Sequence, residues 1–523
     1  MKRTRHAGIV AGFLAIAIAM NAEHSVGQFA NHADVGAPAI AGSTTYDAAT
    51  QEYRMSAAGT NMWADADEFQ FTWNKIKGDF IVRTRAGFIG MGVDAHRKFG
   101  WIARTSLDKD SAYADACVHG DGLTSLQYRR KKGAITEQVE LDIKGGDVIQ
   151  LERRGNTYIF SSARYGETFT TASVTDLDLG EELYIGIFLC SHNAAVVEHA
   201  VFKDVRIIIP PKAGYVPYRD YIGSHLEILN VFTGKLELVH SSPEQFEAPN
   251  WLPGGNGRTL IVNVSGPGPN KGHLKTFDLV TKTMAPFDTG TIVRNNNDHV
   301  LTFDGKLLGI SSGEDDGRSV IHTLPSSGGT PVRITPKSPS YLHGWSPDNK
   351  WLVYTGGRKH TPDATSDKYD IYKIPAEGGE EIRLTDSTGL NDGPEFSPDG
   401  KYIYFNSTRS GLMQLWRMKP DGSDQEMVTN DGFNNWFAHI SPDGKWIVFI
   451  SYGQDVEPAN HPYYKHCYLR IMPVPEVTSE TLAKEGARPR VIAYVFGGQG
   501  TINVPSWSPD CARIAFVSNT RME

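Results

Sequence analysis

The residues best suited to chemistry in this chain are polar and aromatic side chains that stand just before a recurring turn. Such a group suits a sugar or another polyhydroxylated ligand, because rings stack on Tyr or Trp while amides and carboxylates bind hydroxyl groups. The strongest candidate contacts are Tyr341, His343, Asp392, Glu395, Asn435, Trp436, His439 and Asn503. Equivalent positions also hold Glu247, Asn250, residues 295–298, Asn391, Asn434, Gln499 and Thr501. Alternatively, Asn and Asp here simply form Asx turns and cap strand ends.

A divalent metal is the one cofactor that these residues suggest. His299, His343 and His439 occupy equivalent or adjacent repeat positions, so a ring of repeats would bring them toward one axis. Imidazoles are good ligands for divalent transition metals. Gln499, His461 or His466 would complete such a site. Separate surface histidines, or core histidines with satisfied hydrogen bonds, are the alternative.

A further candidate surface lies in an alternating segment nearer the N-terminus. Four residues at every second position share one face of a strand, namely Asp115, Cys117, His119 and Asp121. Three others could share a concave sheet surface with them, namely Trp101, Arg104 and Arg129. A carbohydrate-binding face is one interpretation of this surface, and an ordinary surface with cross-strand pairing is the other. The segment 137–142 lacks the Glu-x-Asp-x-x-Glu spacing of jelly-roll glucanases, which argues against glycosidase chemistry there.

The elements that position the first group are six repeats that each contain a turn like Ser397–Gly400. The Asp position of this turn, or its equivalent, falls at residues 254, 304, 348, 399, 443 and 510. Pro presets φ for the second position of a type I turn, and Asp and Gly suit the last two, so the turn joins two strands as a hairpin. A repeat of this length is typical of a β-propeller with one four-stranded blade per repeat.

The first and last segments of this region each supply a part of the same blade. The last repeat stops at Glu523 after two strands, whereas residues 226–239 form an outer hairpin without an inner one. Pairing them completes one blade and removes the exposed strand edges of an open array. The sequence therefore predicts a six-bladed propeller over residues 220–523.

A second all-β domain is expected over residues 34–209. Seven segments alternate between apolar and polar residues: 69–73, 80–85, 100–104, 125–129, 148–153, 157–161 and 183–189. Short, evenly spaced strands with turn signals between them indicate a β-sandwich. Residues 210–219, which contain Pro210, Pro211 and Pro217, are predicted to be a stiff linker.

The N-terminus and the overall charge indicate an exported protein. Lys2, Arg3 and Arg5 precede a short apolar run from Ile9 to Met20, which is the pattern of a signal peptide over residues 1–22 and is too short for a membrane span. We therefore expect a periplasmic or secreted protein. The formal charge of −8 argues against nucleic acid as a partner. The four cysteines are too few and too widely spaced for a disulfide framework, so buried thiols are expected.

The repeats carry a resemblance to a known family. Residues 220–523 resemble the periplasmic TolB-type six-bladed propellers in their Trp-Ser-Pro-Asp-Gly-Lys-x-Ile-x-Phe-type segments, such as residues 440–449. Residues 34–209 resemble a concanavalin-type jelly-roll module in the closing strands 186–193 and 200–207. The resemblance implies an exported protein that binds other molecules. This chain has the sandwich where TolB has an N-terminal α/β domain, so a role in the Tol envelope system is not implied.

An enzyme is the alternative to a binding protein. The turn segment 394–401 is also similar to that of oligogalacturonate lyases, which are seven-bladed propellers with a metal site. No His-Glu-x-x-His helix or phosphate loop occurs in the sequence. We therefore predict an all-β binding or scaffold protein for glycan-derived or cell-envelope ligands, including envelope proteins, at the propeller mouth or the sandwich face. A metal-dependent polysaccharide lyase is the alternative.

Overall fold

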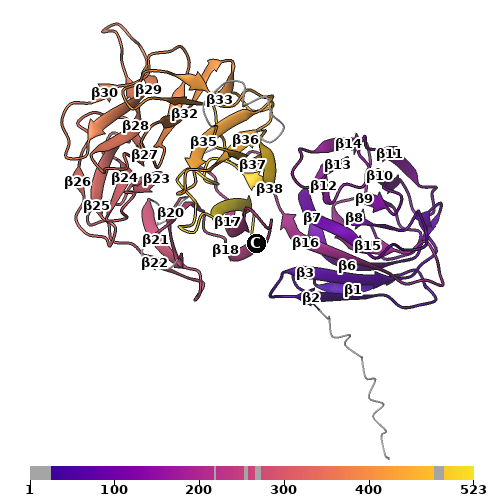
Figure 1. The fold of residues 1–523 in the computed structure, drawn as a ribbon. Helices are drawn as coiled ribbons and strands as arrows, with labels where there is room; N and C mark the ends of the chain where they lie inside the picture. The colour runs from indigo at the N-terminus through magenta and orange to yellow at the C-terminus, as the bar shows by residue number, and fades with distance from the viewer. Residues whose placement is uncertain (1–24, 217–218, 253–256, 266–271, 476–487, 523) are drawn as a thin grey trace, which may run out of the picture.

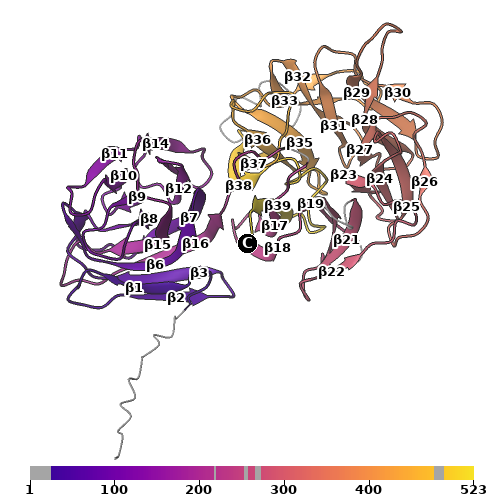
Figure 2. The ribbon, with the colours of Figure 1, turned by 180° about the vertical axis from the view of Figure 1, so that it is seen from behind.

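The computed structural model describes residues 25–216, 219–252, 257–265, 272–475 and 488–522, and every regular element in these ranges is a β-strand (Figure 1). A sandwich and a propeller lie side by side (Figure 1, Figure 2). The predicted signal peptide at residues 1–22, Pro217 of the predicted linker and the predicted turn at Pro253-Gly254 lie outside the described residues. In the described ranges, no helix has the length and hydropathy needed to cross a membrane.

The N-terminal domain contains two seven-stranded antiparallel sheets. The first, in spatial order, consists of β1 (Asn31–Val35), β6 (Phe69–Lys77), β15 (Glu182–Cys190), β8 (Lys98–Arg104), β9 (Tyr113–His119), β10 (Thr124–Arg129) and β11 (Glu137–Glu140). The second consists of β14 (Thr170–Val174), β13 (Thr157–Ala163), β12 (Val148–Arg154), β7 (Phe80–Ile89), β16 (Glu198–Ile208), β3 (Glu52–Ala57) and β2 (Ser43–Asp47). A short hairpin joins β4 (Met62–Trp63) to β5 (Ala66–Asp67).

The two sheets enclose one hydrophobic core. Trp101 and Ile187 of the first sheet pack in the same buried cluster as Val82, Phe160 and Phe202 of the second. Because side chains alternate along a strand, the same strands also present a second face. A smaller cluster containing Phe71, Ile102 and Phe188 lies on that other face of the first sheet.

The C-terminal domain is a six-bladed propeller, which confirms the predicted fold class. Five blades are continuous in sequence: β19 (Phe246–Trp251), β20 (Thr259–Val264), β21 (His273–Asp278) and β22 (Thr283–Pro286); β23 (Asn295–Leu301), β24 (Leu307–Gly313), β25 (Ser319–Pro325) and β26 (Val332–Arg333); β27 (Ser340–Trp345), β28 (Trp351–Arg358), β29 (Lys368–Pro375) and β30 (Ile382–Arg383); β31 (Asn391–Phe396), β32 (Ile403–Ser410), β33 (Leu412–Met418) and β34 (Glu426–Met427); β35 (Asn434–Ile440), β36 (Trp446–Tyr452), β37 (Lys465–Pro473) and β38 (Arg490–Gly497).

The sixth blade joins the two ends of the domain, as the sequence predicted. Its sheet has the order β18 (Leu236–Ser242), β17 (Gly223–Asn230) and β39 (Arg513–Thr520). β39 pairs with the whole of β17, from Gly223 opposite Thr520 to Asn230 opposite Arg513. An isolated β-bridge between Trp507 and Ile514 adds the innermost backbone pairing of this blade.

The hydrogen bonds of the recurring turn explain its sequence. In the turn between β31 and β32, the Ser397 hydroxyl donates to Asp399 Oδ1 at 2.7 Å and accepts from the Tyr402 amide at 3.0 Å. Gly400 has a φ of 69°, in the left-handed region that glycine adopts without steric strain. Ser441 and Asp443 repeat the same hydroxyl contact at 2.6 Å. The turn residues therefore close the hairpin through local hydrogen bonds.

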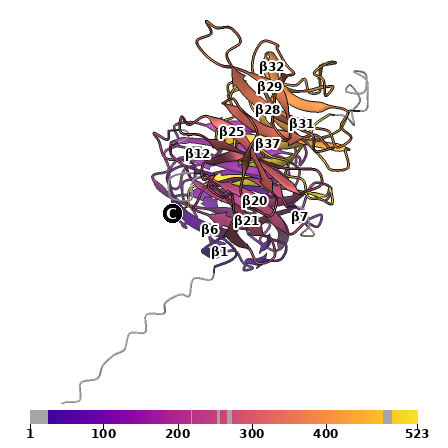
Figure 3. The ribbon, with the colours of Figure 1, turned by 90° about the vertical axis from the view of Figure 1, so that its left-hand side faces the viewer.

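The sandwich contacts the propeller through the last blades and the ring closure. The side view of Figure 3 has the propeller in front of the sandwich. Arg206 of β16 forms a buried ion pair with Glu227 of β17 at 2.7 Å. Ile208, Tyr464 and Phe496 share an apolar cluster across the boundary. The two domains are therefore joined by packed side chains as well as by the linker.

Candidate functional site

A β-bulge in each innermost strand of the continuous blades determines which side chains line the propeller channel. The register shifts lie between Glu247 and Asn250 in β19, Asn295 and His299 in β23, Leu342 and Gly344 in β27, Asp392 and Glu395 in β31, and Trp436 and His439 in β35. Ala248, Gly393 and Phe437 at these bulges have φ values of 54°, 61° and 57°. An extra residue reverses the alternation of side chains. Residues before and after the bulge consequently line different cavities.

Residues before or within the bulges, together with residues of neighbouring strands and loops, line a cavity of about 370 Å³, called the propeller cavity below. Its lining consists of Asn296, Asn297, Asp298, Ser319, Tyr341, His343, Thr355, Tyr369, Leu390, Asp392, Phe437, His461, Gln499 and Asn503. Tyr341, His343, Asp392 and Asn503 are among the strongest candidates from the sequence. The structure therefore brings together four of the eight predicted ligand contacts.

A buried His–Asp pair lies at the centre of the lining. His343 Nε2 is 3.4 Å from Asp392 Oδ1, which also accepts hydrogen bonds from the Thr355 hydroxyl and the Gly393 amide at 2.7 Å each. Burial alone would lower the pKa of His343, but the hydrogen bond and the charges of Asp392 and Asp298 raise it overall. Burial also opposes ionisation of Asp392. The contact with His343 outweighs this effect and lowers the pKa of Asp392. The pair is therefore stabilised in its charged form.

Asp298 is the second carboxyl group of the propeller cavity, and its environment differs from that of Asp392. Its Oδ2 accepts a hydrogen bond from Asn296 Nδ2 at 3.0 Å. Burial raises the pKa of Asp298 to about 6, against the attraction of the His343 charge, and the carboxylate of Asp392 raises it further. Two carboxyl groups with opposite pKa shifts thus face one cavity, a combination that clusters at functional sites.

Several polar atoms in the lining have no partner within the described part of the chain. They include Nδ2 of Asn297 and Oδ1 of Asn503, both on side chains at least nine-tenths buried. The ring of Phe437 stacks on His343 with centroids 5.9 Å apart, and Tyr341 lies 6.5 Å from Tyr369. Buried polar groups normally form hydrogen bonds. The lining thus holds hydrogen-bonding capacity that the described protein groups do not use.

Two predicted ligand contacts lie in the blade interior instead. Trp436 has no exposed surface and packs with Ile450 and Tyr452. Asn435 Nδ2 donates to Gln414 and Asp431 at 3.1 Å, so its amide connects β35 to the neighbouring strand and loop. Neither side chain reaches the cavity surface. The physical reason is the bulge, which turns Phe437 toward the cavity in place of Trp436.

The other predicted contacts, Glu395 and His439, follow the bulges and contact each other. His439 Nδ1 is 2.7 Å from Glu395 Oε2, and His439 Nε2 is 2.7 Å from the Ile502 carbonyl oxygen. Glu395 lines a second cavity of about 280 Å³ with an apolar wall that includes Trp251, Trp345 and Trp507. Both ring nitrogens of His439 are thus already in contact with protein groups.

The three histidines of the metal hypothesis lie at non-equivalent depths. The ladders of β23 and β35 place His299 and His439 at the same position after the bulge, whereas His343 is the extra residue of the bulge in β27. His466, a further candidate ligand, is 3.0 Å from Glu152 of the sandwich. Across the described residues, no group of three or more His, Cys, Asp or Glu side chains is arranged to hold a metal ion.

Sequence reasoning missed five residues of the propeller cavity, namely Ser319, Thr355, Tyr369, Leu390 and Phe437. Thr355 and Tyr369 lie on β28 and β29, the second and third strands of their blade, and reach the cavity near the bulge. Phe437 lies at the bulge of β35 and faces the cavity, whereas its predicted neighbour Trp436 does not. The only signal for Phe437 was its position in a polar, aromatic segment directly before an apolar strand.

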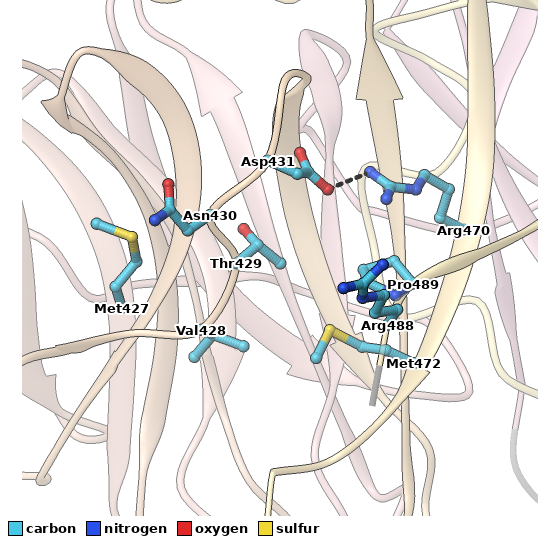
Figure 4. Close-up of a pocket in the computed structure, with 9 residues that line it drawn as sticks. All are labelled: Met427, Val428, Thr429, Asn430, Asp431, Arg470, Met472, Arg488 and Pro489. Carbon is cyan, nitrogen blue, oxygen red and sulfur yellow. Dashed lines mark ion pairs between the residues drawn. The ribbon is translucent and has the colours of Figure 1, made fainter. Parts of the chain in front are cut away.

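A third hollow, shown in Figure 4, lies between the blades that contain β34 and β38. It encloses about 590 Å³. Asp431 and Arg470 form an ion pair across it at 2.8 Å, which neutralises both charges. None of its described lining residues belongs to the predicted candidates. The propeller cavity is therefore the better candidate site.

The sandwich candidates divide between the two faces of the first sheet. Asp115, Cys117 and His119 share one face of β9, as alternation predicts. Trp101 lies in the core between the sheets and therefore on the opposite face. Arg104 and Arg129 are fully buried and form ion pairs with Asp67 at 3.1 and 2.8 Å. Asp121 follows β9 in a turn. All four cysteines of the chain are free thiols.

Comparisons with known proteins agree with this architecture. The TolB beta propeller domain family matches residues 362–461. An uncharacterized protein of Agrobacterium fabrum is 41% identical over 295 residues, which cover 56% of this chain and 92% of the relative. A solved structure from Agrobacterium tumefaciens, provisionally described as a TolB, has 40% identity and a TM-score of 0.51, and covers 58% of this chain and 100% of its own.

A shorter segment of the chain is also similar to a TolB protein. The Tol-Pal system protein TolB of Bordetella pertussis is 44% identical over 55 residues, which are 10% of this chain and 13% of that protein. The fold defines the class of the C-terminal domain as a six-bladed β-propeller. The chain belongs to the TolB-like β-propeller family. Membership of this family supports a general binding or scaffold role.

Asp298 provides a test of the propeller cavity through pH-dependent stability. Because its pKa rises from 3.8 to about 6 on folding, the charged form destabilises the fold above pH 6, and this penalty disappears below pH 4. We expect Asp298→Asn to stabilise the protein at pH 8 by up to about 3 kcal/mol. The gain should vanish toward pH 4. Thermal unfolding across this pH range measures it.

The matched control is Asp315→Asn, on the same blade, where the carboxyl side chain is fully exposed. This variant should unfold like the wild type at every pH. An Asp298→Asn protein that is less stable than the wild type at pH 8 would contradict the assigned burial cost.

Proposed function

We propose that this protein is exported and binds a hydroxyl-rich, glycan-derived ligand in the propeller cavity. The main support is the convergence of amides, two carboxyl groups and aromatic rings from four blades on one cavity, together with the unpartnered polar atoms of Asn297 and Asn503. Amides and carboxylates bind hydroxyl groups in pairs, while an aromatic ring covers the apolar face of a sugar. Export to the periplasm or the outside is supported by the basic and apolar N-terminal segment.

The ligand-binding proposal predicts a selective effect at Tyr341. Its ring lines the cavity and lies beside Tyr369. We expect Tyr341→Ala to weaken glycan binding by about 1–3 kcal/mol, the scale for losing one aromatic stacking contact. A glycan array on the full-length protein identifies the ligand, and isothermal titration calorimetry then measures the loss.

Phe232→Ala is the matched control, because this aromatic ring lies outside the cavity in the turn between β17 and β18 and is 59% exposed. It should bind the ligand like the wild type. If the array contains no ligand for the wild type, the glycan proposal fails and envelope proteins become the partners to test. If Tyr341→Ala and Phe232→Ala bind equally well, the site is not the propeller cavity.

A second candidate function, catalysis on the bound glycan, has one specific observation in its favour. The raised pKa of Asp298, at about 6, and the charged His343–Asp392 pair provide a proton donor and a proton acceptor in one cavity. Product analysis by mass spectrometry distinguishes the two functions. Turnover that Asp298→Asn abolishes while binding persists would identify an enzyme, whereas binding without turnover would identify a receptor or scaffold.

A further inference from the structure

The first sheet of the sandwich carries a separate cavity of about 250 Å³, called the sandwich cavity below. Its floor includes Lys98 of β8, His119 of β9 and Gln127 of β10, and its rim includes Trp63 and His192. These residues come from five segments, of which β8, β9 and β10 follow one another in the sequence. They face away from the hydrophobic core between the two sheets.

The charge in the floor belongs to Lys98. Its side chain is only 2% exposed, and it is the single lysine or arginine among the described residues that line the cavity. Within the described ranges, no carboxylate lies within ion-pair distance of its ammonium group and no side chain or carbonyl accepts a hydrogen bond from it. A buried ammonium without a partner is unfavourable. The fold therefore maintains an uncompensated positive charge at this surface.

His119 adds a hydrogen-bond donor beside Lys98. Gln127 Nε2 is 3.2 Å from His119 Nε2 and donates to it, so that the proton of a neutral imidazole is on Nδ1. Burial and the charge of Lys98 lower the pKa of His119 to about 3, which keeps the ring neutral. Nδ1 of this 5% exposed side chain has no partner in the described structure. The cavity floor thus combines a cation with a free N–H group.

The histidines at the rim extend this donor-rich surface. The ring centroid of His96 is 6.0 Å from that of His119 and 5.4 Å from that of His192. His192 Nδ1 is 3.2 Å from Asp94 Oδ1, so the carboxylate of Asp94 contacts the imidazole of His192 at the edge of the cavity. The exposed ring of Trp63 forms one wall.

The nearest buried carboxyl groups leave the charge of Lys98 largely uncompensated. Asp67 is occupied by Arg104 and Arg129. Asp115 shares the face of β9 with His119 and is fully buried, and burial raises its pKa to about 7 in spite of the attraction of Lys98. Asp115 is therefore largely uncharged below neutral pH.

From these contacts we propose that the sandwich cavity binds an oxyanionic group, such as the carboxylate, sulfate or phosphate of a small molecule, between the Lys98 ammonium and the His119 Nδ1–H. Such a group would complete both unpartnered donors, and hydrogen bonds between ions are stronger than those between neutral groups. This site is independent of the propeller cavity, and it adds an anion-binding function to a second domain.

Isothermal titration calorimetry of the full-length protein with inorganic sulfate, inorganic phosphate and glucuronate tests the proposal. The three probes distinguish a carboxylate site from a sulfate or phosphate site. For the probe that binds, we expect Lys98→Met to lower the affinity by at least about tenfold. Lys109→Met removes the same charge from an exposed position of the same domain and should leave the affinity unchanged.

Asp115→Asn supplies a second test that does not depend on the stability of Lys98→Met. Because it removes a buried carboxyl group that interacts with Lys98 and opposes an anion, we expect binding equal to or tighter than that of the wild type. The probe should also shift the ¹⁵N resonance of His119 Nδ1. No binding of any probe, wild-type affinity in a folded Lys98→Met, weaker binding in Asp115→Asn or an unshifted His119 resonance would each overturn the proposal.

Discussion

Deleting residues 510–523 should abolish cooperative unfolding of the propeller rather than shorten it. The deletion removes β39, which pairs with β17 along its full length and closes the ring. Ile514 and Phe516 of this strand belong to one buried cluster, and Ala515 and Val517 belong to the next. Without them, two hydrophobic clusters open and β17 becomes an exposed strand edge. Differential scanning calorimetry measures the loss of the cooperative transition.

A shorter deletion, of residues 522 and 523, keeps all of β39 and provides the control. It should unfold like the full-length protein. If the protein that lacks residues 510–523 still unfolds cooperatively at the temperature of the full-length chain, closure through β39 does not stabilise the ring.

Replacing Trp436 with Ala should destabilise the protein by about 3–5 kcal/mol, the usual effect of removing a large aromatic side chain from a core. Trp436 has no exposed surface and lies in the cluster between β35 and its neighbours. Its ring contacts His461 with centroids 4.5 Å apart and Phe437 at 5.7 Å, and both of these residues line the propeller cavity. Denaturant unfolding measures the change in free energy.

The matched control is Trp63→Ala, which removes the same side chain from a position that is 36% exposed. We expect a much smaller loss of stability there, because less apolar surface is buried. Equal effects of the two substitutions would mean that Trp436 is not a core residue. If Trp436→Ala loses ligand binding but keeps its stability, the Trp436 ring lies at the cavity surface and not in the core.

The sequence by itself was sufficient for the architecture. The Ser-Pro-Asp-Gly turn depends on contacts within a few residues, such as the Ser397 hydroxyl with Asp399, and such local chemistry is visible in one chain. Its recurrence predicted the number of blades, and the unmatched hairpin at 226–239 predicted how β39 closes the ring. Strict alternation along β9 likewise placed Asp115, Cys117 and His119 on one face.

The tertiary structure alone decided which side chains meet. Within a strand the period of two predicts a face, but one extra residue in a bulge reverses that face, and in β35 no glycine marks the bulge. This is why Trp436 lies in the core while Phe437 faces the cavity, and why His343 is separated from His299 and His439. The sandwich cavity follows the same principle, because Lys98, His119 and His192 meet only after the strands of the first sheet have paired.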